Sequence, residues 1–293
     1  MDNSLRKHIS CIAHNSSEGR LLAGDGRTAI VDCGMAFCAD TTIMNIKKAL
    51  NGRLLDYILL THTHYDHVGA LPYFREEWPD AQLVTSEIGA AVLLKPTPRR
   101  VIRELSAAAA DLYGASASLQ YCDDAFHADI LVKEGDVIEL GGLTAVTMET
   151  PGHTRDSLCF YIPELKMLML NETPGVLMPD GSMYPCYLTG YRDTLNSIEK
   201  CRATDHEIIS LPHRGIVEGV SVGDFYAKAS QINAICYEFM SGLIDGGLGE
   251  DEIISAYAKK YFNEILGTFQ PREAFEANAK AMLKCTAREL AHG

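Results

Sequence analysis

Several features that would place this chain in a membrane or outside a cell are missing from its sequence. No apolar run reaches the roughly 18 residues that a membrane-spanning helix needs, and the first 20 residues hold no apolar stretch typical of a secretory signal. The nine cysteines include no Cys-x-x-Cys pair, so they are predicted to be free thiols in a reducing compartment. Together these absences predict a cytoplasmic protein that does not use a membrane as a partner.

Positive charge is also scarce. Lys and Arg total 26 against 39 Asp and Glu, which gives a formal net charge of -13. An acidic surface repels phosphate backbones, so no nucleic-acid partner is expected. No Gly-x-Ser-x-Gly elbow and no phosphate-binding Gly-rich loop followed by Lys is present, which argues against a serine hydrolase and a P-loop enzyme. A homodimer remains open.

The pattern of apolar residues predicts an α/β protein with a helical end. Short apolar runs bounded by turn residues indicate strands at 27–33, 56–61 and 83–85 and again between 130 and 170, with helical segments between them. After residue 220, apolar residues recur every three or four positions in three stretches that are typical of amphipathic helices. We therefore predict a main α/β domain at 1–220 and a three-helix appendage at 221–293.

The residues with the clearest chemistry are in the run THTHYDH at 61–67. His62, His64, Asp66 and His67 follow directly after a buried strand, whose end at the sheet edge lets neighbouring side chains turn towards one point. Neutral imidazoles with a carboxylate suit zinc, iron, manganese or cobalt. A solvated polar loop is the alternative, but it would give no role to so many ligand-type side chains. The run therefore predicts a metal site.

This run and its later companions resemble the signature of the metallo-β-lactamase superfamily. The companions are the turn TPGHT at 150–154, Glu172 after the apolar run 167–170, and His213 after the run IISLP at 208–212. The resemblance covers residues 25–215 and implies a four-layer αββα sandwich of two mixed sheets, with the active site between the sheets. It also implies that residues 1–220 are the catalytic domain and that the C-terminal helices at 221–293 cover its pocket.

The resemblance also implies a site for two divalent metal ions, with zinc expected and iron or manganese as alternatives. Its two metal-binding sets would be His62, His64 and His153 for one ion and Asp66, His67 and His213 for the other. Glu172 stands where the family has a bridging aspartate. Glutamate offers the same oxygen ligands but is one methylene longer, so it would bridge both ions, bind one of them, or leave the second site weak.

Within the family, the chain resembles most the thioesterase of bacterial alkylquinolone signal biosynthesis and related thioesterases and lactonases. The likeness rests on the run HTHYDH followed by Leu71-Pro72-Tyr73 and on the final helices. It implies hydrolysis of a small thioester or ester by a metal-bound hydroxide, with Asp66 as the catalytic carboxylate that orients the hydroxide and carries a proton. The alternatives are a lactonase or phosphodiesterase, an iron-dependent redox enzyme, and a regulatory binding protein on the same fold.

Four tyrosines are candidates for substrate contacts. Tyr65 lies within the metal-binding run, and Tyr184, Tyr187 and Tyr191 follow Glu172 in a segment rich in turn residues. Their phenols could contact the substrate or an oxyanion. Ordinary packing of the aromatic rings is the alternative for each.

Overall fold

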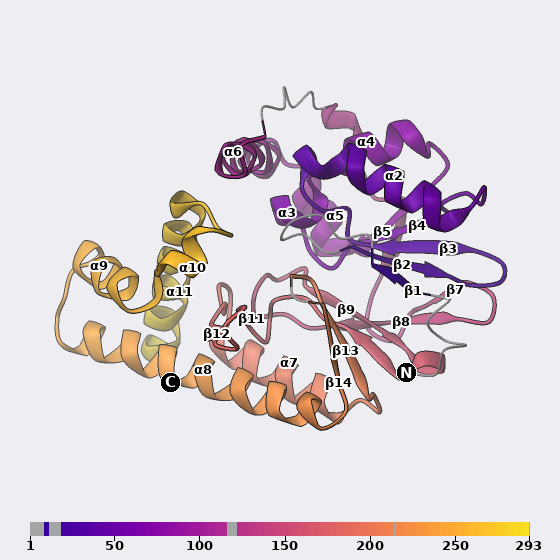
Figure 1. Cartoon of the computed structure of the whole chain (residues 1–293). Helices are drawn as coiled ribbons and strands as arrows, with labels where there is room; N and C mark the ends of the chain where they lie inside the picture. The colour runs from indigo at the N-terminus through magenta and orange to yellow at the C-terminus, as the bar shows by residue number, and fades with distance from the viewer. Residues whose placement is uncertain (1–8, 12–18, 116–121, 214, 293) are drawn as a thin grey trace. The chain divides into compact units, whose positions relative to one another are not determined.

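The computed structural model describes residues 9–11, 19–115, 122–213 and 215–292 (Figure 1). The chain divides into two compact units, each built from several stretches of sequence. Unit 1 consists of Met1–Glu149, Leu158–Asn171 and Asp205–Ile216, and unit 2 of Thr150–Ser157, Glu172–Thr204 and Val217–Gly293. The sequence predicts a single break at 220–221, whereas two earlier segments also belong to the unit that holds the last helices.

The first sheet of unit 1 has six strands in the order β1-β2-β3-β4-β5-β6. Their bounds are β1 Ile9–Cys11, β2 Arg20–Ala23, β3 Thr28–Val31, β4 Tyr57–Leu59, β5 Gln82–Ser86 and β6 Ile130–Val132. The strands from β1 to β3 are antiparallel, and those from β3 to β6 are parallel. The carboxyl ends of the four parallel strands therefore lie at one edge of the sheet.

The second sheet also has six strands, in the order β14-β13-β10-β9-β8-β7. Their bounds are β7 Val137–Glu139, β8 Thr144–Glu149, β9 Leu158–Ile162, β10 Met167–Met169, β13 Ile208–Leu211 and β14 Gly215–Glu218. The strands from β7 to β10 are antiparallel, and β10 pairs with β13 in parallel. Both sheets are mixed, as the sequence predicts for this α/β chain.

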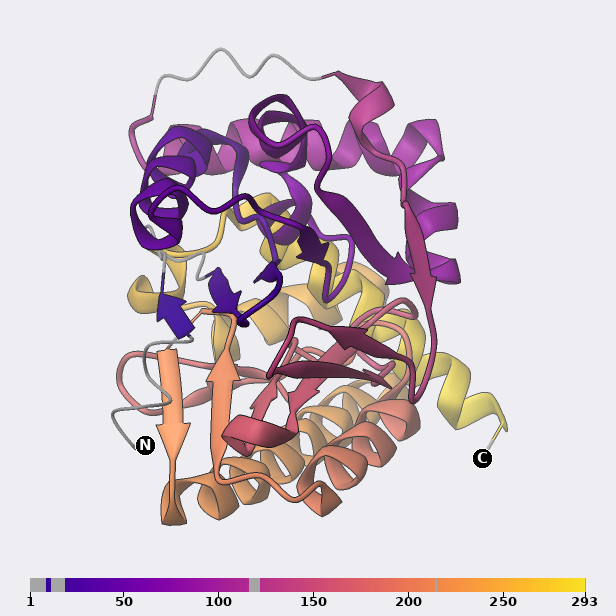
Figure 2. The ribbon, with the colours of Figure 1, turned by 90° about the vertical axis from the view of Figure 1, so that its right-hand side faces the viewer.

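The two sheets of unit 1 pack face to face around an apolar core (Figures 1 and 2). In β4 the side chains of Tyr57 and Leu59 enter this core, whereas Ile58 points to the opposite face of the sheet and packs with the helices there. This alternation follows from the two-residue period of a strand. Because both faces of β4 are buried, its sequence is apolar throughout.

Helices cover the outer face of the first sheet. They are α2 (Ala39–Leu50), α3 (Tyr65–Val68), α4 (Leu71–Glu77), α5 (Glu87–Leu93) and α6 (Pro96–Leu112), with short 3-10 turns at Ala36–Cys38 and Asp123–Ala125. A further 3-10 turn, Pro163–Leu165, connects β9 and β10 in the second sheet. Ile46 of α2, Phe74 of α4 and Ile102 of α6 belong to one buried cluster with Ile30 and Ile58 of the sheet. The cluster fixes the position of the loop between β4 and α4, which carries the run 61–67.

The turn between β2 and β3 lies against the turn between β7 and β8. A Cβ atom on Gly24 would lie 2.2 Å from the carbonyl oxygen of Leu140, so no other residue fits at this approach. The backbone amides of Asp25 and Arg27 donate to Gly141 and Leu140 across the contact, at 2.6 and 2.8 Å. These bonds join the two sheets at the end of the sandwich.

Unit 2 is mainly helical. It contains the two-stranded sheet of β11 (Val176–Leu177) and β12 (Met183–Tyr184) and the helices α7 (Tyr191–Ala203), α8 (Val220–Asp245), α9 (Glu250–Tyr261), α10 (Glu264–Gly267) and α11 (Arg272–His292). The apolar stripes of the last helices meet in one core, to which Met240, Tyr257 and Phe275 contribute. The three predicted helices are present, and the single turn of α10 is added between the second and the third. Among the described helices, none combines the length and the apolar character needed to cross a membrane.

Candidate metal centre

The run 61–67 leaves the first sheet at the carboxyl end of β4. Leu60 continues the strand for one more hydrogen bond, donating its amide to the carbonyl of Val84 at 2.9 Å. His64 then precedes the first turn of α3, and its carbonyl accepts the amides of His67 and Val68 at 3.0 Å each. This tight turn folds the metal-binding run back on itself.

The folding of the run brings its histidine rings together. The ring centre of His62 lies 4.7 Å from that of His64 and 4.1 Å from that of His67. His62 is 0% exposed and His67 is 2% exposed. Buried imidazoles at such distances are unusual in a protein core unless a ligand or a hydrogen-bonded network uses them.

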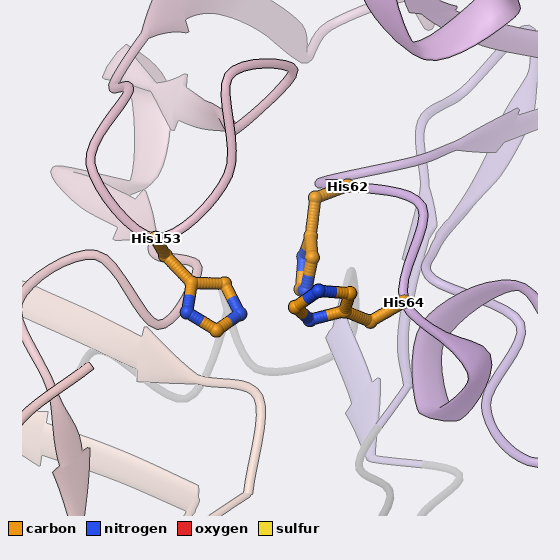
Figure 3. A group of neighbouring side chains, drawn as sticks. All are labelled: His62, His64 and His153. Carbon is orange, nitrogen blue, oxygen red and sulfur yellow. The ribbon is translucent and has the colours of Figure 1, made fainter. Parts of the chain in front are cut away.

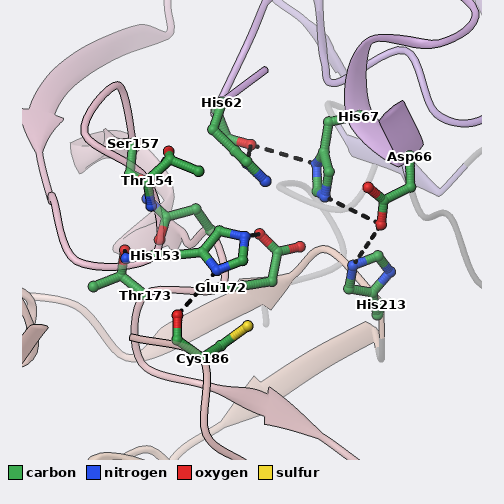
Figure 4. Close-up of polar contacts among 12 residues, drawn as sticks. His62, Asp66, His67, His153, Thr154, Ser157, Glu172, Thr173, Cys186 and His213 are labelled. Carbon is green, nitrogen blue, oxygen red and sulfur yellow. Dashed lines mark hydrogen bonds and ion pairs between the residues drawn. The ribbon is translucent and has the colours of Figure 1, made fainter. Parts of the chain in front are cut away.

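Unit 1 alone assembles one complete set of potential metal ligands. His213, in the turn after β13, joins Asp66 and His67, and one ligand atom from each of the three lies within 4.8 Å of the others. Asp66 Oδ2 is 3.8 Å from His67 Nε2 and 3.5 Å from His213 Nε2 (Figure 4). Two imidazoles and a carboxylate converging in this way fit a divalent transition metal in both ligand type and spacing.

Asp32 supports this set, although its position in the sequence predicts only the end of a strand. Its Oδ2 lies 2.8 Å from Nδ1 of His67, and its Oδ1 accepts the backbone amide of Thr61 at 2.8 Å. Because an ionised carboxylate only accepts, Nδ1 of His67 carries the proton and Nε2 is left to bind a metal. The Thr61 hydroxyl, 2.8 Å from Asp32 Oδ2 and 3.1 Å from His62 Nδ1, ties the two histidines to the same carboxylate.

The backbone conformation of Asp32 is unusual and could not be predicted from the sequence. Its φ is 61°, in the left-handed region that aspartate and asparagine enter more readily than other non-glycine residues. The residue is 5% exposed. In the sequence, only one feature indicates a role for Asp32 near the metal-binding run. It is a carboxylate at the end of the predicted strand that precedes the strand leading into the run 61–67.

Unit 2 holds the remaining predicted ligands, His153 and Glu172. His153 lies in the turn after β8 and Glu172 follows β10, and both are almost fully buried. His153 Nε2 is 3.8 Å from Glu172 Oε2, and His153 Nδ1 is 3.1 Å from the backbone carbonyl of Cys186 (Figure 4). A carbonyl only accepts, so Nδ1 of His153 is the protonated nitrogen, and Nε2 is the one directed towards Glu172.

The predicted ligand sets draw on both units. His62 and His64 come from the loop after β4 in unit 1, and His153 from the turn after β8 in unit 2 (Figure 3). Within unit 1 the structure brings together His62, His64, Asp66, His67 and His213, and within unit 2 it brings together His153 and Glu172. The set Asp66, His67 and His213 lies within unit 1, whereas the sharing of the other metal ion by His62, His64 and His153 stays a prediction.

The four candidate tyrosines are placed in two different cores. Tyr65 packs with the helices of unit 1, and burial, together with the negative charge of Asp66, raises the pKa of its phenol. Tyr184 accepts a hydrogen bond from Tyr257 at 3.0 Å, and the Tyr187 hydroxyl lies 3.2 Å from that of Thr286. Tyr191 stacks on Tyr237 with ring centres 4.0 Å apart. These partners favour the packing role for Tyr184 and Tyr187, and their role in binding substrate stays a prediction.

Comparison with known proteins identifies the family. The chain matches the family model of the metallo-beta-lactamase superfamily over residues 21–213, and it belongs to that superfamily. It is similar to a metallo-beta-lactamase family protein from Thermus thermophilus, with a TM-score of 0.61, 18% identity and coverage of 97% of this chain and 93% of that one. An archaeal superfamily protein from Sulfolobus tokodaii gives a TM-score of 0.56 at 20% identity, covering 74% of this chain and 80% of that one. These likenesses confirm the predicted fold.

The relatives with curated names differ in their activities. An acyl-coenzyme A thioesterase from Gallus gallus, MBLAC2, is 29% identical over 56% of this chain and 54% of its own length. A hydroxyacylglutathione hydrolase from Fuscovulum blasticum is 32% identical over 53% of this chain and 46% of its own length. A coenzyme F420H(2) oxidase from Methanothermobacter marburgensis is 28% identical over 53% of this chain and 33% of its own. The chain thus spans about half or less of the length of these three relatives, which leaves the particular reaction open.

Proposed function

We propose that this protein is a dinuclear metal-dependent hydrolase of a small thioester or ester. The observation that carries the proposal is the convergence of Asp66, His67 and His213 in unit 1, with His62 and His64 beside them. The matches to a thioesterase and to a hydroxyacylglutathione hydrolase support the same reaction class, because both of these relatives act on thioesters. The resemblance to the alkylquinolone-signal thioesterase extends the proposal to the thioesters of that pathway as a candidate substrate class.

In the proposed site, His62, His64 and His153 hold one metal ion, and Asp66, His67 and His213 hold the other. Glu172 would bridge both ions, bind one of them, or leave the second site weak. Bound divalent ions would lower the pKa of a water towards neutrality and polarise the carbonyl of the substrate. Zinc suits this set of nitrogen and oxygen ligands, and iron and manganese suit it as well.

The residues of the chain then have separate tasks. The Asp66 carboxylate, fixed between His67 and His213, orients the attacking water and carries a proton towards the leaving group. Asp32 holds His67 in the tautomer that leaves Nε2 available, and the Cys186 carbonyl does the same for His153. A thiolate leaves without strong protonation, so this arrangement needs no second general acid.

The proposal is tested by metal analysis combined with a substrate panel. We expect about two metal ions per chain and hydrolysis of an acyl-coenzyme A thioester or a glutathione thioester, with slower cleavage of a lactone and of bis-nitrophenyl phosphate. Removal of the metal with a chelator should abolish hydrolysis, and adding zinc, iron or manganese should restore it. A metal-loaded protein that cleaves none of these substrates would overturn the proposal.

An iron-dependent redox enzyme is the second candidate. The matches to coenzyme F420H(2) oxidase and to a nitric oxide reductase from Moorella thermoacetica favour it. Those matches cover only 33% and 32% of the relatives' lengths, so most of each redox protein has no counterpart in the aligned region. Iron content with consumption of oxygen or nitric oxide, and no hydrolysis in the panel, would favour this candidate.

The same panel addresses the remaining alternatives and the role of the last helices. A lactonase or a phosphodiesterase would reverse the expected order of rates, and a regulatory protein would bind metal or ligand without turnover. We also propose that the helices from α8 to α11 select the acyl chain. Selectivity among acyl-coenzyme A substrates of increasing chain length, altered by substitutions on these helices, is the supporting result.

A further inference from the structure

The turn that carries His153 is held by hydroxyl groups from two other segments of unit 2. The Thr173 hydroxyl donates to the carbonyl of Thr150 at 2.8 Å and accepts the amide of His153 at 3.3 Å. The Ser197 hydroxyl of α7 donates to the carbonyl of Pro151 at 2.7 Å. The backbone of the turn is therefore held at Thr150, at Pro151 and at the amide of His153 itself.

The third carbonyl of the turn, that of Gly152, binds to Thr189. The Thr189 amide donates to it at 2.9 Å, and the Thr189 hydroxyl donates at 3.2 Å. Gly152 has a φ of 141°, and a Cβ atom there would lie 2.2 Å from the hydroxyl of Thr194. The turn thus fits closely against the segment that leads from β12 into α7. The same segment contains Cys186, whose carbonyl accepts from Nδ1 of His153.

This segment is in turn fixed by α11. Arg288 donates a hydrogen bond to the carbonyl of Thr189. Glu289 accepts the amides of Tyr191 and Arg192 at 2.6 and 3.2 Å. The helix α7 begins after Gly190, which has no side chain to cap the helix, so the carboxylate of Glu289 supplies the cap from a distant part of the chain. The side chain of Glu289 is only 12% exposed.

We infer that Arg288 and Glu289 of α11 are positioning residues for His153. They fix Thr189 and the start of α7, Thr189 and Ser197 fix the turn at 150–153, and the Cys186 carbonyl fixes the ring of His153. The importance of this arrangement for catalysis rests on the proposed function, in which His153 is a metal ligand. The arrangement itself is a property of unit 2 and can be measured without metal or substrate.

The experiment uses the full-length, metal-free protein with Glu289→Ala as the test variant. Hydrogen–deuterium exchange of the amides at 150–157 and 186–194 should become about fivefold faster, which is the effect of losing one helix cap. Exchange in β4 and β9 of unit 1 should not change. In the long-range ¹H–¹⁵N spectrum at about pH 8, where an ordinary imidazole is neutral, His153 should shift from a single Nδ1–H tautomer to a mixture.

Two further variants make the result specific. Glu276→Ala is the matched control, because Glu276 lies on the same helix and pairs with Arg272 at 2.8 Å, at the other end of α11. It should leave exchange at 150–157 and the tautomer of His153 as in the wild type. Glu289→Gln keeps an acceptor oxygen and should retain most of the protection. Should Glu289→Ala fail to fold, Glu289→Gln combined with Arg288→Ala, which removes the bond to the Thr189 carbonyl, serves as the test variant.

The inference is overturned if Glu289→Ala, or Glu289→Gln together with Arg288→Ala, leaves both the exchange at 150–157 and the tautomer of His153 unchanged. It is equally overturned if exchange rises by the same factor throughout the chain, since that is a general loss of stability. A protein that shows the local effect but binds no metal would instead refute the proposed function while leaving the positioning role in place.

Discussion

The two units hold their candidate ligands in different ways. In unit 1, four of the ligand-type residues are within six positions of one another, and side chains of neighbouring strands, Asp32 and Thr61, hold them. In unit 2, His153 and Glu172 are far apart in sequence, and backbone carbonyls and hydroxyls from several segments hold the turn of His153. A short run of residues can specify the first kind of site, whereas the second kind depends on the packing of a whole unit.

The largest expected effect comes from the unit 1 run itself. His64→Ala removes one of the predicted metal ligands, so bound metal should fall and hydrolysis should drop by at least about 100-fold. Metal content by elemental analysis and initial rates provide the measurement. The exposed His127, which pairs with Asp129 in unit 1, supplies the control variant His127→Ala, for which wild-type values are expected. Full metal content with near wild-type activity in His64→Ala would exclude His64 as a ligand.

Glu172 tests the corresponding contribution of unit 2. Glu172→Gln removes the negative charge but keeps the shape, so metal content should fall from about two towards about one per chain, and hydrolysis should fall about 100-fold. Glu172→Asp is the sharper variant. If the surroundings fit the longer side chain, the shorter aspartate will not reach the metal ions well and the rate of hydrolysis will drop. A rate at or above that of the wild type would show that glutamate is merely tolerated at this position. Both metals and full activity in Glu172→Gln would show that Glu172 is no ligand.

Asp32→Asn should show whether Asp32 positions His67 for metal binding or only stabilises the fold of unit 1. Asparagine tolerates the same left-handed backbone, but its amide nitrogen cannot accept from His67 or Thr61, so buried donors lose their acceptor. We expect the free energy of unfolding to fall by about 2 kcal/mol, and metal affinity to fall about tenfold or more. Urea denaturation and metal competition provide the measurements. Unchanged metal affinity at reduced stability would mean that Asp32 supports the fold alone.

The smallest effect is expected in unit 2 at alkaline pH. Burial raises the pKa of the Tyr187 phenol, so the folded protein holds a proton that the unfolded chain loses above about pH 10. The stability linked to this group is complete below that pH and is lost as the pH rises beyond it. Tyr187→Phe should therefore flatten the decline of unfolding free energy between about pH 9 and 11.

Tyr237→Phe serves as the control for the loss of a phenol oxygen elsewhere in unit 2. Parallel stability curves for the wild type and Tyr187→Phe would contradict the prediction.

The contrast between the units also explains what the sequence could reveal. The fold and the run 61–67 were predictable because strand patterns and closely spaced ligands are local signals. Asp32 was missed because its role depends on β3 lying beside β4, which a single chain does not display. The Cys186 carbonyl was missed because every residue type carries one. For Tyr184 and Tyr187, the sequence could not separate substrate contact from packing, since both place an aromatic residue near a turn-rich segment.

The bond between Tyr191 and Glu289 joins residues that are 98 positions apart. At the usual 5–20 residues per second, a ribosome needs about 5–20 s to make the chain between them. The strands of unit 1 from β1 to β10 precede Tyr191 in the chain, so the run 61–67 and Asp32 are synthesised before that interval begins and can fold together. The start of α7, by contrast, is capped only after Glu289 has been synthesised. We therefore expect the site to mature in order of synthesis, with the surroundings of His153 completed last, after α11 has been made.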